Sequence, residues 1–265
     1  MAPNGPTCVR EEKSGFDMEK KYLLLSDIHG NLSALQAVLK DCQGDDVSGI
    51  FILGDCIDYG MRSNEILQKL QDLAQGEWKD KIIANLWGNH EKLVVDKDLE
   101  RLSSDRGREM ARYTADHLSP ASLDYMNVSM NPQGWQDFAL GHYRCLAVHG
   151  SQEDPFWKAI APDNLRGDYS QYDIVLGGHS HYSHSFTHFY PSEDEELRCK
   201  KAVLFINPGS VGQPRNQNPY AQYALLSLPS RRVELRAVSY DVVYEQSLFP
   251  IGIDVFYKNR LTRGV

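Results

Sequence analysis

The chain has 265 residues, 42% of them hydrophobic, and a formal net charge of −8 at pH 7. This length can bury a full core in one α/β domain, and the acidic balance argues against a broad basic face for duplex nucleic acid. The five cysteines form no Cys-x-x-Cys pair, so reduced thiols are favoured over a disulfide framework.

Residues 1–20 are rich in Pro, Gly, Glu and Lys and contain no apolar stretch typical of a signal peptide or a membrane anchor. We therefore expect a disordered N-terminal tail over 1–20 and a single domain over 21–265. The expected location is the cytoplasm, with no membrane association. The sequence leaves the quaternary state open, a homo-oligomer included.

Three strand–loop–helix units follow this tail. In each, a short apolar run leads into a polar or glycine-containing turn, and apolar residues at helical spacing follow the first two turns. The strands are expected at 22–25, 50–53 and 81–84, and the helices from Asn31 and over 63–75. Such units predict a mainly parallel sheet.

The second half of the chain is richer in strand patterns. Before it, residues 98–118 are charged and helix-compatible, and Ser119-Pro120 has the residues of a helix N-cap and first turn. Further strands are expected at 138–140, 145–148, 173–176, 202–206, 220–228 and 232–239, with 190–201 as a solvated hairpin connection. Two sheets packed face to face would collect the strand ends at one edge, where ligands bind in open α/β proteins.

Carboxylates and imidazoles occur where these strands end. Asp27 and His29 are two residues apart, so on an extended segment their side chains would point the same way. Asp55 follows an apolar run, where a carboxylate is costly unless a cation or hydrogen bonds satisfy it. The later candidates are His149, His179 and His181. Each alone fits a structural role, but the set predicts a metal centre, and its mixed ligands without thiolate suit Mn²⁺, Fe or Zn²⁺.

Three further polar residues are candidates for roles at the same site. Asn89 is a neutral oxygen ligand in a glycine turn, although asparagine at such a position is more often a turn former. His90 is the better candidate to donate a proton to the leaving oxygen or to stabilise transition-state charge. Asp58 is compatible with orienting His90 or with an Asx turn. Two ions about 3.5–4 Å apart activate water and polarise a phosphoryl oxygen, so the set predicts a phosphoester hydrolase.

The ordered motifs Asp-x-His, Gly-Asp-x-x-Asp, Gly-Asn-His-Glu, His and Gly-His-x-His resemble those of the calcineurin-like metallophosphoesterase superfamily, over about residues 21–228. Segments 26–32, 58–60 and 207–215 are similar to its small prokaryotic branch of YfcE-type phosphodiesterases. The resemblance implies a four-layer αββα sandwich of two mixed β-sheets flanked by helices. It implies one metal held by Asp27, His29, Asp55 and His181, a second held by Asp55, Asn89, His149 and His179, and a catalytic dyad of His90 and Asp58.

We therefore expect two divalent ions, Mn²⁺ first, with Fe, Zn, Ni or Co as alternatives. The expected reaction is hydrolysis of small phosphodiesters or nucleotides by a metal-bridging hydroxide, without a covalent enzyme intermediate. Tyr59 stands where phosphoprotein phosphatases of the superfamily have arginine, which favours a diester or a nucleotide that stacks on the ring over a terminal phosphate. Arg215 is the first candidate phosphate contact, with Arg144 and Arg166 as alternatives.

Three other functions stay open. They are hydrolysis of dinucleoside polyphosphates such as diadenosine tetraphosphate, phosphomonoester hydrolysis, and a non-catalytic protein-binding scaffold like the retromer subunit of the same superfamily. The intact ligand and dyad residues argue against the scaffold. The acidic balance disfavours a nuclease that acts on polymers.

Overall fold

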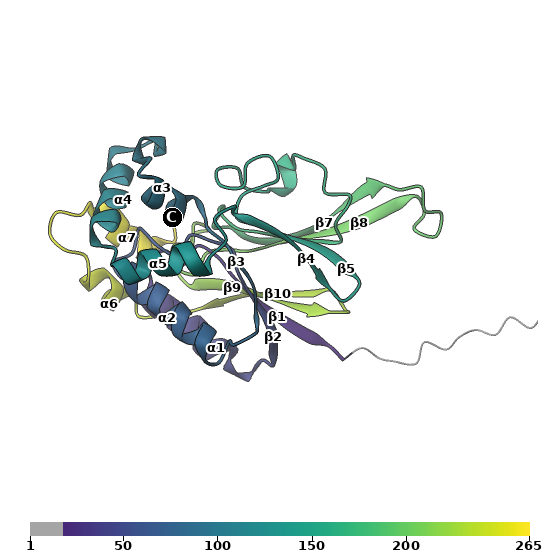
Figure 1. The fold of residues 1–265 in the computed structure, drawn as a ribbon, viewed down its shortest axis with the longest axis horizontal. Coiled ribbons are helices and arrows are strands. Elements are labelled where there is room, and N and C mark those ends of the chain that lie inside the picture. The colour runs from purple at the N-terminus through teal and green to yellow at the C-terminus, as the bar shows by residue number, and fades with distance from the viewer. Residues whose placement is uncertain (1–17) are drawn as a thin grey trace, which may run out of the picture.

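The computed structural model describes residues 18–265, which form two five-stranded mixed sheets flanked by helices (Figure 1). The strands are β1 Lys20–Leu25, β2 Val47–Ile52, β3 Ile82–Asn85, β4 Trp135–Leu140, β5 Tyr143–Val148, β6 Ile174–Gly177, β7 Ser183–Pro191, β8 Lys200–Pro208, β9 Ala221–Leu228 and β10 Arg232–Val238. The helices are α1 Leu32–Asp41, α2 Ser63–Gln75, α3 Asn89–Asp96, α4 Asp105–His117, α5 Pro120–Ser129, α6 Val242–Ser247 and α7 Val255–Arg263. Short 3-10 turns are η1 Cys42–Gly44, η2 Leu99–Arg101 and η3 Pro162–Asn164. Nearly all of the expected tail over 1–20 lies outside the described residues.

Each sheet combines three parallel strands with antiparallel strands, on one side in the first sheet and on both sides in the second. The first sheet has the order β10-β9-β1-β2-β3, with β1, β2 and β3 parallel. The second has the order β4-β5-β6-β8-β7, with β5, β6 and β8 parallel. Parallel strands end at the same edge of a sheet, so the loops that follow β1, β2 and β3, and those that follow β5 and β6, gather at two neighbouring edges.

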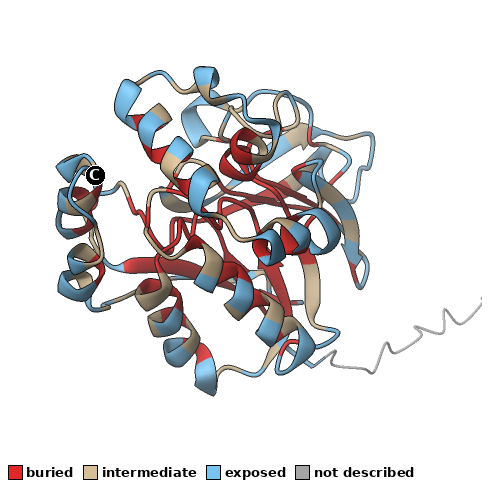
Figure 2. Cartoon of the chain, turned by 60° about the vertical axis from the view of Figure 1, so that its left-hand side comes forward, coloured by how far each residue is buried: buried red, intermediate tan, exposed pale blue. Residues whose placement is uncertain are grey.

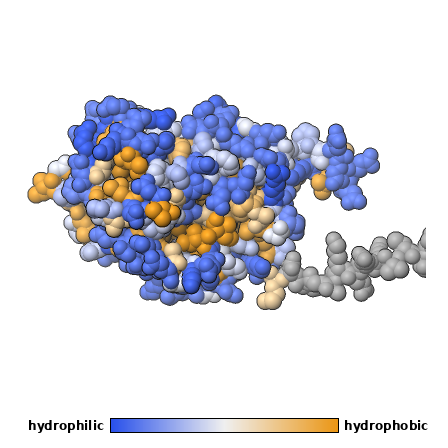
Figure 3. Space-filling view, viewed as in Figure 1, coloured by the Kyte–Doolittle hydropathy of each residue, from blue (hydrophilic) through white to orange (hydrophobic). Residues whose placement is uncertain are grey.

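Side chains alternate across the strands and divide the core into three layers. In β1, Leu23 and Leu25 face the helices that cover the first sheet, whereas Tyr22 and Leu24 pack between the two sheets. Figure 2 shows buried residues concentrated along the strands and the inward faces of the helices. The space-filling view shows that hydrophilic side chains cover much of the surface (Figure 3). Among residues 18–265, no helix combines the length and the apolar character needed to cross a bilayer.

The predicted fold of two mixed sheets flanked by helices is confirmed, although the outermost layer of the second sheet has an unexpected form. The segment 149–173, with the single 3-10 turn η3, covers this face. Its residues Ile160, Tyr169 and Tyr172 pack on Val175 and Phe205 of the sheet. Irregular chain anchored by apolar side chains therefore takes the place of long helices in this layer.

Local signals explain several element boundaries. The Asn31 side chain accepts a hydrogen bond from the Ala34 amide, which caps α1, and Ser119 caps α5 ahead of Pro120. Helix α2 occupies the predicted residues 63–75. Four elements were not predicted from the sequence, namely β7, α3, α6 and α7. Strand β7 lies at the edge of its sheet and is largely exposed, so its side chains lack the apolar run that identifies a buried strand.

Candidate functional site

The loops that carry the candidate ligands are bonded to one another through their backbones. The Asp27 amide donates to the Gly54 carbonyl at 3.0 Å, which joins the loops after β1 and β2. The amide of Gly212 donates to the Asp27 carbonyl at 3.0 Å, which joins the loop after β8 in the second sheet to the first sheet. These bonds bring residues from both sheets to one place.

Several candidate ligands have a left-handed backbone. The φ angles are 52° at Asp27, 47° at His29, 54° at Asp55, 64° at His179 and 61° at His181. This conformation costs a non-glycine residue on the order of 1–3 kcal/mol, and such strain occurs most often at functional sites. Asp27 and His29 do converge, but the predicted reason, an extended segment, is wrong. A tight left-handed turn directs both side chains to the same point.

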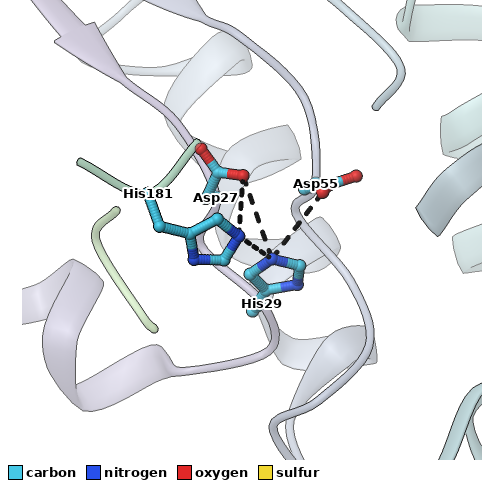
Figure 4. A group of neighbouring side chains, drawn as sticks. All are labelled: Asp27, His29, Asp55 and His181. Carbon is cyan, nitrogen blue, oxygen red and sulfur yellow. Dashed lines mark hydrogen bonds and ion pairs between the residues drawn. The ribbon is translucent and has the colours of Figure 1, made fainter. Parts of the chain in front are cut away.

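The first ligand group consists of Asp27, His29, Asp55 and His181 (Figure 4). Their ligand atoms all lie within 4.8 Å of one another, and all four side chains are buried. The His181 Nε2 atom is 3.2 Å from Asp27 Oδ1, and the His29 Nε2 atom is 3.7 Å from Asp55 Oδ2. Asp27 Oδ1 accepts no hydrogen bond from the described residues, so it has a free lone pair aimed into the group.

The hydrogen bonds of the two imidazoles in this group leave room for a cation between them. His29 Nδ1 donates to the Ile57 carbonyl at 3.0 Å, and His181 Nδ1 donates to the Gln213 carbonyl at 2.6 Å. A carbonyl only accepts, so each Nδ1 carries the proton and each Nε2 presents a lone pair. The two Nε2 atoms are 3.3 Å apart. Burial holds the pKa of both imidazoles well below the usual range, so a metal ion, rather than a second proton, fits between the two lone pairs.

The second ligand group consists of Asp55, His149 and His179, with Asn89 beside it. His149 Nδ1 donates to the Leu53 carbonyl at 2.7 Å, and His149 Nε2 lies 3.3 Å from Asp55 Oδ2 and 3.2 Å from Asn89 Oδ1. Burial opposes protonation of His149, but the Asp55 carboxylate raises its pKa to about 9. A proton on His149 Nε2 would face Asp55 Oδ2 and Asn89 Oδ1, which is the place that a metal ion would take.

Asp55 belongs to both groups, and its charge is stabilised differently from that of Asp27. Burial opposes ionisation of Asp55, yet the positive charges of His149 and His90 hold its pKa well below the usual range. Burial, together with the neighbouring charge of Asp55, raises the pKa of Asp27 to about 7. A pair of buried carboxylates at this spacing is an electrostatic cost that divalent cations would remove.

Glu91 holds the loop after β2 in place, and the sequence analysis did not assign it a role. Its buried carboxylate accepts from the amides of Asp55, Cys56 and Gly88 at 2.9, 2.7 and 2.7 Å. A Cβ on Gly88 would lie 2.1 Å from Asp55 Oδ1, so only glycine fits there. The Gly-Asn-His-Glu motif was the available signal, because its acidic residue falls in the first turn of α3.

His90 and Asp58 form a buried hydrogen-bonded pair beside the ligand groups. His90 Nδ1 lies 2.7 Å from Asp58 Oδ2, and Thr114 of α4 donates to the other Asp58 oxygen at 2.7 Å. Burial would lower the pKa of His90, but the nearby Tyr59 oxygen, Asp55 and Asp58 raise it well above its usual value. Asp58, itself held by Thr114, therefore fixes the orientation of an imidazole that binds a proton readily.

Tyr59 and Arg215, predicted as substrate contacts, lie in the loops that follow β2 and β8, and their contact with substrate stays a prediction. The Tyr59 ring centroid is 4.6 Å from that of His29 and 4.5 Å from that of His90. The carbonyl of Gln213, two residues before Arg215, accepts a hydrogen bond from His181 Nδ1, so the segment that carries Arg215 passes beside the first group. The two other arginines considered as phosphate contacts lie elsewhere. Arg144 is at the amino end of β5, and Arg166 is exposed beside η3, where it is bonded to Asn164.

Residues 21–231 match the family model described as the calcineurin-like phosphoesterase superfamily domain. The chain is 27% identical over 233 residues to an uncharacterized protein of Methanocaldococcus jannaschii, which covers 83% of this chain and 87% of that protein. It is 24% identical over 206 residues to the phosphodiesterase YfcE of Escherichia coli, which covers 78% of this chain and 86% of YfcE. The metallophosphoesterase from Sphaerobacter thermophilus has a similar structure, with a TM-score of 0.67, 27% identity, and coverage of 93% of this chain and 100% of that chain.

Proposed function

Because the chain belongs to the calcineurin-like phosphoesterase superfamily, we propose that it is a binuclear metal-dependent phosphodiesterase that acts on small phosphodiesters or nucleotides. Membership makes it a metal-dependent phosphoric ester hydrolase whose substrates are small phosphoesters. The number of metal ions, the roles of individual residues and the preference for diesters are the proposal. The similarity to YfcE, a phosphodiesterase, supports the preference.

The observation that carries this proposal is the position of Asp55 in both ligand groups. One ion would be held by Asp27, His29, Asp55 and His181, and the other by Asp55, Asn89, His149 and His179. Two divalent ions there would lower the pKa of a bound water and neutralise charge on the phosphoryl oxygens. Mn²⁺ is the first candidate for this carboxylate and imidazole set, with Fe, Zn, Ni and Co as alternatives.

The residues around these ligands supply proton transfer and binding. His90 would donate its proton to the leaving-group oxygen, and Asp58 would keep the imidazole oriented and charged before that transfer. Tyr59 offers an aromatic face beside His90, suited to a base or another flat leaving group. Arg215 would offset part of the negative charge of the substrate.

We also propose a domain organisation and a cellular location for the protein. Residues 21–265 would act as one domain, because ligands from both sheets are needed for each ion. The buried thiols Cys42, Cys56 and Cys145 are free, which suits a reducing compartment such as the cytoplasm.

The first test is an assay of metal-stripped protein with Mn²⁺ restored, comparing bis-p-nitrophenyl phosphate with p-nitrophenyl phosphate. Metal-dependent cleavage with a strong preference for the diester is the expected result. Preference for the monoester would replace the proposal with a phosphomonoesterase. No cleavage of either compound would contradict the proposal and direct attention to dinucleoside polyphosphates, and then to a scaffold role.

A further inference from the structure

The helix α7 covers the outer side of Tyr59, and it lies beyond the residues that match the family model. The Tyr257 ring stacks on Tyr59 with centroids 5.2 Å apart. The guanidinium carbon of Arg260, one turn further along α7, lies 5.6 Å from the Tyr59 centroid and 5.0 Å from that of Phe256. Aromatic faces attract a guanidinium and hold it in a fixed plane. Arg260 is therefore positioned next to the residue that contacts His29 and His90.

Arg260 is buried and has no carboxylate side chain as a partner. Only 7% of its surface is exposed, and its Nε donates at 2.5 Å to an oxygen of the terminal carboxylate of Val265. Its two Nη groups make no hydrogen bond to the described residues. In contrast, Arg62 and Arg236 form ion pairs with Glu245 and Asp45. One carboxylate oxygen engages only the Nε of the Arg260 guanidinium and leaves both Nη groups without an acceptor among the described residues, so a bound anion that contacts them would be stabilising.

Arg215 supplies a second guanidinium at the same place. It forms no hydrogen bond to the described residues, and its buried Nε has no partner. The amide of Gln217 donates to the Gly264 carbonyl at 2.7 Å, so the chain just after Arg215 is fastened to the end of α7. Burial and the positive charge of Arg215 lower the pKa of Arg260 to about 10, which is the effect of two like charges in proximity. Two adjacent cations held together need an anion of high charge.

The position of this arginine pair relative to the ligand groups defines what it can bind. The carbonyl of Gln213, two residues before Arg215, accepts from His181 Nδ1 at 2.6 Å, whereas Arg260 lies across the Tyr59 ring. An anion between the two guanidinium groups is thus adjacent to the scissile phosphoryl group, rather than in its place. A phosphoryl group, with three oxygens and up to two charges, suits two guanidinium forks better than a carboxylate does.

We propose that Arg260 and Arg215 bind a second phosphoryl group of the substrate, linked to the one held at the metal centre. The substrate class is then phosphoesters that carry two adjoining phosphoryl groups, as in nucleoside diphosphate derivatives and longer linked phosphates. This inference rests on the proposed function, because the metal centre must hold the first phosphoryl group. It assigns α7 to substrate selection, although α7 contributes no metal ligand.

The test compares two ligands that differ by one phosphoryl group. Titration calorimetry with Mn²⁺-loaded protein measures the Kd of adenosine 5′-monophosphate and of the uncleavable α,β-methylene adenosine diphosphate. The wild-type chain should bind the diphosphate at least about 10-fold more tightly. Arg260→Gln should weaken diphosphate binding about 10- to 100-fold and affect monophosphate binding far less, because a charge-assisted bidentate contact is lost. Arg263→Gln, an exposed arginine on the same helix, is the matched control and should keep the wild-type ratio.

Two further variants distinguish the loss of a phosphate contact from a folding defect. Arg260→Lys keeps a charge but loses the fork, so it should give an intermediate ratio of affinities. Arg215→Gln should reduce the same ratio from the other side of the proposed site. An unchanged ratio in Arg260→Gln, an equal loss for both ligands, or a wild-type chain that does not distinguish them would overturn the inference. Failure to cleave bis-p-nitrophenyl phosphate would instead count against the proposed function, since that compound has a single phosphoryl group.

Discussion

Charged side chains are arranged in opposite ways at the metal-site loops and in the cluster formed by Lys21, Asp45, Glu234 and Arg236. In this cluster, which we call the Asp45 cluster, Asp45 is 2.6 Å from Lys21 Nζ and 2.6 Å from Arg236 Nη1. At the metal-site loops, Asp27 and Asp55 lie close together, and imidazole lone pairs face one another. The first arrangement pairs opposite charges and stabilises the fold. The second brings carboxylates and lone pairs together, an electrostatic cost that bound divalent cations would remove.

The largest effect is expected from Asp55→Asn. The amide keeps the shape of the side chain but cannot bridge two cations with a full negative charge, so both ions should be held more weakly. We expect metal content well below two ions per chain and a fall in turnover of roughly 10³-fold. Elemental analysis combined with the diester assay measures both quantities. Two bound ions with near-normal turnover would show that the shared carboxylate is not the bridge.

His90→Ala should separate proton transfer from metal binding. Turnover should fall about 10²- to 10⁴-fold because the proton donor is lost, while metal content stays at the wild-type level. His142→Ala is the control, since His142 is exposed and lies in the turn between β4 and β5. Loss of metal in the His90 variant would mean that the side chain supports the ligands instead of the leaving group.

Asp45→Asn should have the opposite effects, because it should lower the stability of the fold and leave turnover nearly unchanged. The substitution weakens the contacts of Asp45 with Lys21 and Arg236, which are only partly exposed. The free energy of unfolding should fall by about 1–2 kcal/mol, with turnover within about twofold of wild type. Urea denaturation and the diester assay on the same preparation check this prediction. A large loss of turnover would remove the contrast between the two regions.

The Asp45 cluster also predicts a smaller effect of acid on stability. Burial opposes ionisation of Asp45, but hydrogen bonds from Arg236 and Lys21 hold its pKa below the usual range. The folded chain therefore binds this proton less readily than the unfolded chain does. The stabilisation is fully present above the unfolded carboxyl pKa of about 4 and is lost as pH falls through the lower folded value. Urea midpoints measured at about pH 5 and 3 should fall less steeply in Asp45→Asn than in wild type.

Much of the candidate metal site could be predicted from sequence because several of its residues directly follow predicted strands. Asp27, Asp55 and His149 each follow an apolar run, and the carboxyl ends of parallel strands must meet at the edge of a sheet. The confirmed fold and family follow from the same periodicity and motif order. The roles of the individual residues stay predictions until the variants are measured.

The parts that sequence reasoning missed depend on contacts between distant segments. The Gly-Asn-His-Glu motif indicates that Glu91 caps α3, but its other amide partners lie 34–36 residues earlier in the chain and leave no local pattern. Arg260 reaches Tyr59 from a C-terminal helix with little apolar periodicity. The left-handed turn at Asp27 and His29 was also hidden, because both residue types are common in ordinary loops and the strain is stabilised by bonds from other loops.

The ligand groups draw on both sheets, since Asp27, His29 and Asp55 follow strands of the first sheet and His181 and His149 follow strands of the second. An ion held by Asp27 and His181 together is therefore a cross-link between the two halves of the sandwich. Metal binding free energy would then add to the free energy that keeps the sheets associated. The availability of metal ions would then affect the folding stability of this protein as well as its catalytic rate.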